Sequence, residues 1–352
     1  MAIPTKIMNM SRRRCPIEKS NESVFFSLVD YRNNYFMSDD PDKIIEFYEG
    51  FENRDQLIQW MKERPKGASY IHEVEGDKDI IVVIPTADFN GKYAKTCREE
   101  IFKGLHMVFI ESGEIPDPYF NYSHSVNVGV KKAMEYEPKW IIVSNDDMEK
   151  IDDISILIKD LRDIDPVEVK TVYIASSEYH STKRIIIKKR FLYSHIILLK
   201  RLILNGRELH ELTKRRIKLE KKFYCSYIIA PENLIYKVLG RVVGSMIVGM
   251  SFWIFGKVLI SEYNGSIFDE TFINDSEDID LSFRLSSRNL KYGRSSYRIG
   301  DRIGSSLGSY RNKKLNMIGF GINSKNMLSG VIREFRSIAS VVYLNSKDFK
   351  GL

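Results

Sequence analysis

The 352 residues are enough for one large domain or two ordinary ones, and 43% of them are hydrophobic, so the chain can bury a core. With 29% charged residues, 21 glycines and 10 prolines, the composition excludes collagen-like and low-complexity chains. The three cysteines are too few and too far apart for a disulfide framework or a cysteine-rich zinc site, which favours a reducing, cytoplasmic compartment. Glutamine occurs only twice while Ile, Lys and Arg abound, a bias compatible with a thermophilic source.

Residues 1–77 are expected to form an N-terminal extension that contains two helices. Asp40 and Pro41 are typical of a helix start, Gly50 of a helix end, and Asn53 of the cap of a second helix. The sequence gives no chemical indication of what this extension does.

Membrane-directed segments are not expected. No long apolar stretch follows the three consecutive arginines near the start, so a secretory signal peptide is not predicted. The longest uncharged stretch lies between Arg241 and Lys257 and falls short of the roughly 20 residues of a transmembrane helix.

From residue 78 the pattern changes to short apolar runs that alternate with helical segments, which is typical of a doubly wound α/β domain. Because these runs are apolar throughout, they favour strands buried on both faces of a mostly parallel, Rossmann-like central sheet flanked by helices. The expected strands are 80–84, 106–110, 140–144 and 170–175, and the expected helices are 92–103, 154–161 and one that begins near Ser125.

Ligands of such sheets bind beyond the carboxyl ends of the strands, which nominates the turns 85–88, 111–113 and 145–147. None of these turns contains the Gly-x-Gly-x-x-Gly or the Gly-Lys-Ser/Thr phosphate loop. A nicotinamide-dependent Rossmann enzyme and a P-loop NTPase therefore both lack their expected chemistry.

Positive charge is concentrated in residues 183–222, which hold fourteen Lys and Arg against three Glu, a local excess of +11 in a chain of net charge +7. We expect residues 181–224 to form a basic helical insertion. Two interpretations stay open: solvated helices, or a surface that makes peripheral contact with an anionic membrane at its cytoplasmic face. Nucleic-acid binding is not expected, because aromatic stacking residues are sparse in this segment.

Asp146 and Asp147 directly follow an apolar strand, where two adjacent carboxylates are costly unless a cation offsets their charge. A divalent metal, Mg²⁺ or Mn²⁺, that bridges to a diphosphate is one explanation. On local sequence alone, an acidic turn that caps the next helix explains the pair equally well.

A second acidic group lies far along the chain, at Asp269 and Glu270 and again at Glu277, Asp278 and Asp280. The apolar residues after it predict a short helix, whose N-terminal dipole favours an ionised carboxylate that can accept a proton. Helix capping explains one of these acids better than it explains three. On chemistry alone, Glu277, Asp278 and Asp280 are equal candidates for a catalytic base.

The order and separation of these segments resemble inverting glycosyltransferases with the GT-A fold, most closely glycosyltransferase family 2, over roughly residues 79–306. The resemblance is carried by Val83-Ile84-Pro85-Thr86, Ser125-Val126-Asn127-Val128-Gly129, Asn145-Asp146-Asp147, Gly265-Ser266-Ile267-Phe268-Asp269-Glu270 and Glu277-Asp278-Ile279-Asp280-Leu281. It implies metal-assisted transfer of a sugar from a nucleotide-diphosphate donor to a hydroxyl of a glycan, a lipid-linked or a protein acceptor, with inversion at the anomeric carbon. We accordingly divide the chain into a nucleotide-sugar-binding half (78–180), an acceptor and catalytic half (225–310) and a C-terminal helical tail (311–352) around the basic insertion.

Residue by residue, the resemblance implies a donor site and a base on opposite sides of the reacting carbon, as such a displacement requires. On the donor side, Pro85, Thr86, Asp88 and Glu111 would line the nucleoside pocket, Asn127 would face the nucleotide, Asn145 and Asp146 would lie near the ribose and the metal, and Asp147 would bind the metal. On the acceptor side, Asp278 matches the catalytic base, and Asp269, Glu270, Glu277 and Asp280 would shape the acceptor site or support the loop.

Two positions depart from the family pattern. The family often has a His that helps to bind the metal, but residues 297–306 contain none and Arg302 stands at about that place, so we expect Arg302, together with Arg298, to contact the diphosphate. Glu111 stands where these enzymes usually have an Asp, which leaves the nucleobase of the donor open.

Two other functions are compatible with the sequence. A sugar nucleotidyltransferase would share the sheet and the paired carboxylates, but it should show a Gly-rich triphosphate loop that residues 85–91 lack. A non-catalytic module that binds sugar or tethers the chain to a membrane is the other alternative.

Overall fold

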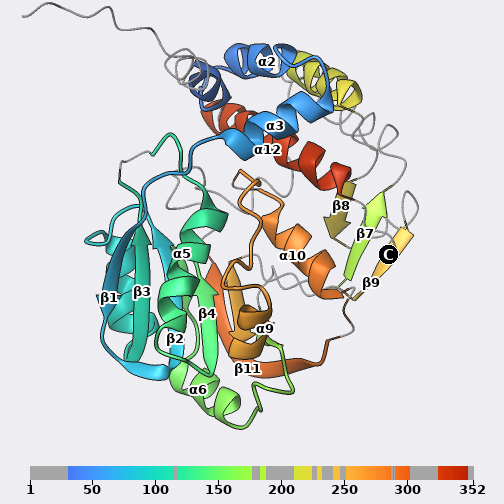
Figure 1. Ribbon diagram of the computed structural model, residues 1–352. Helices are drawn as coiled ribbons and strands as arrows, with labels where there is room; N and C mark the ends of the chain where they lie inside the picture. Colours follow the sequence, from blue (N-terminus) through green and yellow to red (C-terminus); the bar gives the residue numbers. More distant parts are fainter. Residues whose placement is uncertain are drawn as a thin grey trace, which may run out of the picture.

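The computed structural model describes residues 31–113, 117–176, 183–187, 210–223, 228–231, 241–245, 251–273, 275–286, 288, 290–301 and 324–347. Within these ranges the chain is an α/β protein with one large sheet, helices on its faces and a layer of helices across one end of the strands (Figure 1). The predicted α/β class is therefore confirmed. A smaller sheet is formed by β8 (Ile228–Pro231), β7 (Lys183–Ile187) and β9 (Arg241–Ser245).

The large sheet has eight strands in the order β1-β3-β2-β4-β10-β6-β11-β5. Their bounds are β1 (Tyr70–Val74), β2 (Asp77–Thr86), β3 (Leu105–Glu111), β4 (Trp140–Ser144), β5 (Met148–Lys150), β6 (Thr171–Ser176), β10 (Phe252–Gly256) and β11 (Tyr292–Asp301). The expected strands at 80–84, 106–110, 140–144 and 170–175 are confirmed as β2, β3, β4 and β6.

The expectation of a mostly parallel sheet is wrong, because the sheet is mixed. β2 pairs in parallel with β3 and β4, and β6 pairs in parallel with β11. In contrast, β1, β5 and β10 run antiparallel to the strands beside them. The direction of β10 could not be predicted because this strand is apolar and buried along its whole length, and the hydrophobic pattern of such a strand is the same for a parallel and an antiparallel arrangement.

Helices cover both faces of the sheet. They are α4 (Lys92–Thr96), continued by a π-helical turn (Cys97–Ile101), α5 (Tyr122–Met134), α6 (Ile154–Arg162), α9 (Lys257–Glu262) and α10 (Glu277–Ser286). Ile80 and Val82 of β2 belong to the core that includes α4 and α6, whereas Ile81 and Val83 belong to the core that includes α5, α9 and α10. The close approach of α5 explains Gly129, where an added Cβ would lie 2.4 Å from Cγ1 of Val83.

The two helices expected in the N-terminal extension are confirmed as α2 (Pro41–Glu49) and α3 (Arg54–Glu63). Asp40 caps α2 by accepting the backbone N–H of Asp42, and Asn53 caps α3 by accepting those of Asp55 and Gln56. Local side-chain chemistry therefore sets where these helices begin.

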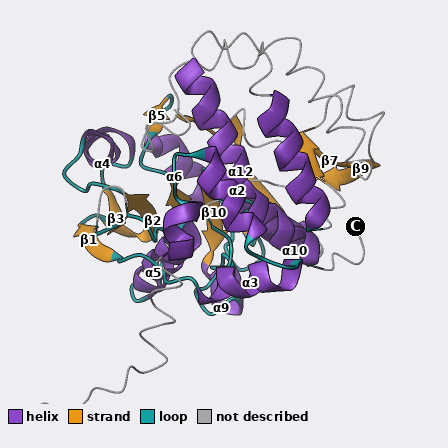
Figure 2. Ribbon diagram, turned by 90° about the horizontal axis from the view of Figure 1, so that it is seen from above, coloured by secondary structure: helices purple, strands orange, loops and turns teal. Residues whose placement is uncertain are grey.

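A helical layer is formed by α2, α3, α12 (Ser324–Ser346) and the helical residues 210–222, which share a hydrophobic core. The Tyr48 hydroxyl joins α2 to α12, since it donates to the carbonyl of Phe335 at 2.7 Å and accepts from the backbone N of Ala339 at 3.1 Å. Figure 2, seen from above, shows α2 and α12 crossing in front of β10. Buried Arg64 ties the layer to the body by donating to the carbonyl of Pro118 at 2.7 Å.

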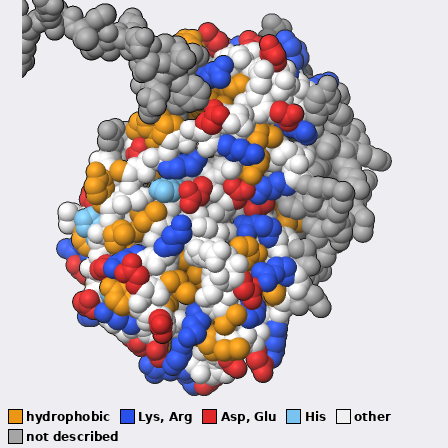
Figure 3. All heavy atoms as spheres, in the orientation of Figure 1, with side chains coloured by type: hydrophobic (Ala, Val, Ile, Leu, Met, Phe, Trp, Pro, Cys, Tyr) orange, Lys and Arg blue, Asp and Glu red, His pale blue; other side chains and the backbone are white. Residues whose placement is uncertain are grey.

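The basic insertion is only partly helical. Residues 183–187 form strand β7 and residues 210–222 are helical, while 188–209 lie outside the described residues. Within the helical part, Ile217, Leu219 and Phe223 are buried in the helical layer, so its outward face is basic and its apolar face is already covered. Among the described residues, no helix combines the length and the apolar character needed to cross a bilayer. On the face shown in Figure 3, basic and acidic side chains of the described residues are interspersed.

Candidate functional site

The topology brings the predicted site segments to one edge of the large sheet. β2, β3 and β4 are parallel and end at Thr86, Glu111 and Ser144, and β2 lies between the other two. The strand order therefore reverses at β2, which makes this edge the switch point at which α/β sheets bind ligands.

Both acidic groups lie at this carboxyl edge. The first, Asp146 and Asp147, directly follows β4. The second lies at the start of α10, which leads into β11, and β11 runs parallel to β6 and therefore to β4. A helix that precedes a parallel strand must run back from the carboxyl edge to the amino edge, so its N-terminus lies at the carboxyl edge.

Asp146 is buried and fixed to the end of β2. Its Oδ2 accepts a hydrogen bond of 2.8 Å from Oγ1 of Thr86, and its backbone carbonyl accepts from the thiol of Cys97 at 3.3 Å. Burial raises the pKa of Asp146 to about 6, and the charge of Asp147 adds to this rise, although the bond from Thr86 opposes it. Asp147 is only 2% exposed, so two carboxylates are held together away from water.

Such a pair suits a divalent cation. Carboxylate oxygens are the donors that Mg²⁺ and Mn²⁺ prefer, and sites that act on phosphates take one or two carboxylates and complete the shell with phosphate oxygens and water. Among the described residues, no group of three or more His, Cys, Asp or Glu is arranged around a common metal position. The donor chemistry of the two aspartates is compatible with such a cation.

The turn after β2 is braced by Glu111. Oε1 of Glu111 accepts the backbone N–H of Phe89 at 2.9 Å, and Oε2 accepts from Nε2 of His72 at 2.7 Å. The His72 ring stacks on Phe89 with centroids 4.4 Å apart. Glu111 thus holds the turn in place, with Pro85 buried beneath it and Asp88 exposed at its tip.

Asn127 is placed differently from its expected role. It is 1% exposed, and its amide Nδ2 donates to the carbonyl of Phe268 at 2.9 Å and to Oε1 of Glu270 at 3.0 Å. Its Oδ1 accepts the backbone N–H of Phe268 at 3.1 Å. Because its donors and its acceptor match the loop so closely, Asn127 braces the acidic loop 266–272 rather than facing a nucleotide.

Glu270 takes a supporting place in the same loop. Nδ1 of His124 donates to Oε2 of Glu270 at 2.8 Å, and this bond, together with that from Asn127, lowers the pKa of Glu270. Asn121, which caps α5, donates to the carbonyls of Glu270 and Phe272. The cap at Asn121 also explains why α5 begins three residues before the expected start at Ser125.

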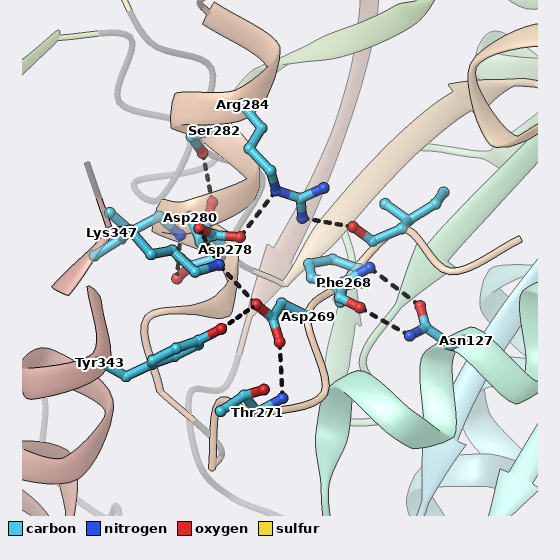
Figure 4. A network of polar contacts seen from close by, with 12 residues as sticks. Asn127, Phe268, Asp269, Thr271, Asp278, Asp280, Ser282, Arg284, Tyr343 and Lys347 are labelled. Carbon is cyan, nitrogen blue, oxygen red and sulfur yellow. Dashed lines mark hydrogen bonds and ion pairs between the residues drawn. The ribbon is translucent and has the colours of Figure 1, made fainter. Parts of the chain in front are cut away.

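Asp269 and Asp280 are bridged by the lysine that directly follows the C-terminal helix (Figure 4). Nζ of Lys347 lies 2.7 Å from Oδ2 of Asp269 and 2.7 Å from Oδ1 of Asp280. Burial alone would raise the pKa of Asp269, but the hydrogen bond and charge of Lys347 outweigh it and hold the pKa at about 2. The hydroxyl of Tyr343 also donates to Asp269, at 2.8 Å, and Nε of Arg284 donates to Asp280, at 2.9 Å.

Glu277 and Asp278 begin α10. Burial, followed by the charge of Asp278, raises the pKa of Glu277 well above its ordinary value. Oδ1 of Asp278 accepts the backbone N–H of Ile279 at 2.8 Å. Asp280 is paired with Lys347 and Arg284, and burial favours the neutral form of Glu277. The role of Asp278 as a base stays a prediction of the resemblance.

The remaining predicted residues are placed as follows. Arg298 forms a two-point ion pair with Asp152, at 2.8 and 3.0 Å, so its guanidinium is committed to the protein. Arg302 lies outside the described residues. Asn145 is half-buried, and its backbone N–H donates to the carbonyl of Ser251 at 3.1 Å.

Three residues near the acidic loop were not found from the sequence: Tyr343, Lys347 and Lys66. Burial, followed by the charge of Arg64, lowers the pKa of Lys66, while the charges of Glu270 and Asp269 oppose this shift. No local pattern marks these residues, because each lies in a helix end or a connection far along the chain from the loop.

Comparison with protein-family models, with curated proteins and with solved structures found no significant match.

Proposed function

We propose that this chain is an inverting glycosyltransferase of the GT-A type, related to family 2, that moves a sugar from a nucleotide-diphosphate donor to an acceptor hydroxyl. The observation that carries the proposal is the buried Asp146 and Asp147 pair at the switch point of the sheet, hydrogen-bonded to Thr86 at the end of β2. Buried carboxylates in such a place are expensive unless a cation and its anionic ligand occupy it.

The donor is proposed to lie across the ends of β2, β3 and β4. The turn that carries Pro85 and Asp88 is held by Glu111 and would form the wall of the nucleoside pocket. Asp147, with Asp146 beside it, would hold Mg²⁺ or Mn²⁺ together with the diphosphate oxygens. When bound, the metal would neutralise the charge that develops on the leaving diphosphate.

The acceptor is proposed to approach from the α10 side. Asp278 lies in the first turn of α10, where the helix dipole favours the ionised form that can take the acceptor proton. Asp269, Glu270 and Asp280 would act as supports, because each is held by the hydrogen bonds described above. The proposed base and the proposed metal ligands lie far apart in the sequence, and both belong to segments at the carboxyl edge of the sheet.

The proposal is tested with a panel of nucleotide sugars in the presence of Mn²⁺ or Mg²⁺, read first as a thermal shift and then as slow donor hydrolysis or transfer. We expect Asp147→Asn to abolish the metal-dependent shift, and Asp278→Asn to keep the shift but lower turnover by at least about 100-fold. Asp79→Asn is the matched control, because Asp79 is exposed and pairs with Lys139 at the amino edge. A wild-type protein that binds no nucleotide diphosphate with either metal refutes the proposal.

A further inference from the structure

The C-terminal helix α12 ends inside the acidic group of the proposed site. Two donors reach it from there, the hydroxyl of Tyr343 in the last turn and the ammonium of Lys347, the residue directly after the helix. Lys347 contacts Asp269 and Asp280, which lie in different elements, and its Nζ also lies 4.8 Å from the ring centroid of Phe272. Figure 4 shows the lysine reaching between the loop and α10.

The helix α12 has anchors other than Lys347. The helix is already anchored by the fully buried Phe335, Ile338 and Val342, and by the two hydrogen bonds of Tyr48. A lysine that merely fastened a helix end would not need two carboxylates at 2.7 Å in a partly buried place, where holding charges away from water is costly. Its position indicates an electrostatic task.

That task follows from the charges around Asp278. Among the described residues, the charged and titratable groups near this end of α10 are Glu277, Asp280 and Arg284 of the helix, Asp269 and Asp275 of the preceding loop, Arg333 of α12, and Lys347 directly after α12. Each unpaired carboxylate near a base makes loss of the base's proton harder. Lys347 places one positive charge against two of these carboxylates, Asp269 and Asp280.

We infer that Lys347 is a positioning residue of the proposed transfer, which acts through Asp269 and Asp280 to keep Asp278 working as a base near neutral pH. The inference rests on the proposed function. It makes the end of α12 part of the catalytic unit, although α12 lies in the helical layer and its core is shared with the N-terminal helices.

The test measures the pH dependence of kcat for the wild type, Lys347→Met and Lys347→Arg, with saturating donor and metal. Without the ammonium of Lys347, Asp280 is paired with one cation instead of two. Its carboxylate then acts more strongly on Asp278, which lies two residues earlier on α10 at a distance of roughly 8 Å. We expect Lys347→Met to move the acidic limb of the profile up by about one pH unit, so that kcat falls about tenfold at pH 6 and less at pH 8. Lys347→Arg should restore the limb, and the apparent KM for the donor should change less than about twofold in both variants.

Lys222→Met is the matched control, because Lys222 also lies in the helical layer but, among the described residues, donates to the carbonyls of Tyr48 and Glu49 and to no carboxylate. It should lower thermal stability without moving the limb. An active wild type whose acidic limb is unchanged in Lys347→Met refutes the positioning role and leaves the transferase standing. A wild type that turns over no donor refutes both the transferase and the role of Lys347. If the acidic limb of Lys222→Met shifts as far as that of Lys347→Met, the effect is general to the helical layer and the inference is also refuted.

Discussion

Asp146→Asn should stabilise the protein at high pH while removing function. In the folded chain the pKa of Asp146 is raised from 3.8 to about 6, first by burial and then by Asp147. A carboxyl group whose pKa is raised on folding costs no stability below its unfolded pKa, and it costs progressively more as the pH rises through its folded pKa. Above pH 6 the whole penalty is present, and Asn avoids it.

The size of the effect follows from the same values. The difference between a pKa of 3.8 in the unfolded chain and about 6 in the folded chain corresponds to a penalty of about 3 kcal/mol. Asn keeps an oxygen that can accept from Thr86, but it adds amide hydrogens with no assured acceptor, at a cost of about 1 kcal/mol at any pH. We therefore expect a net gain of about 2 kcal/mol at pH 8 and a loss of about 1 kcal/mol at pH 4.

The measurement is urea unfolding of the wild type and the variant at pH 4, 6 and 8 in buffer that contains a chelator. Added Mn²⁺ should then raise the unfolding midpoint of the wild type more than that of Asp146→Asn, since a ligand that binds only the folded state stabilises it. If the difference between the two proteins is the same at pH 4 and pH 8, the charge of Asp146 carries no folding penalty and the reasoning fails.

Two further predictions concern packing and surface charge. Gly129→Ala should lower the free energy of unfolding by about 1–3 kcal/mol, because the new Cβ would lie 2.4 Å from Val83 and 3.0 Å from Ile110; an unchanged urea midpoint would show that α5 can move away from the sheet. If the helical residues 210–222 contact anionic membranes, their covered apolar face means that the contact is electrostatic. Replacing exposed Lys214, Lys218 and Lys221 by Ser should then weaken flotation with anionic vesicles by on the order of 100-fold, and 0.5 M salt should weaken the wild type similarly, whereas salt-resistant flotation would point to apolar insertion.

Much of the local structure was predictable from the sequence because it depends on near neighbours. The apolar runs of β2, β3, β4 and β6 predict buried strands, and Asp40 and Asn53 are typical caps that predict the starts of the two N-terminal helices. The carboxylates at 146 and 147 were recognisable because charge directly after a buried strand is costly. Helix caps, buried strands and adjacent charges depend on neighbouring residues, so the local sequence is enough to predict them.

Strand direction and side-chain partners depended on the tertiary structure. β10 runs antiparallel between β4 and β6, and an apolar run that is buried on both faces carries no mark of its direction. Asn127 forms a hydrogen bond with Phe268, which lies 141 residues away in the sequence, and Asp269 forms one with Lys347, 78 residues away. The spacing of hydrophobic residues determines which face of a helix or strand is buried. Which distant polar side chain contacts that element depends on the tertiary structure, because the two residues come together only when the chain has folded.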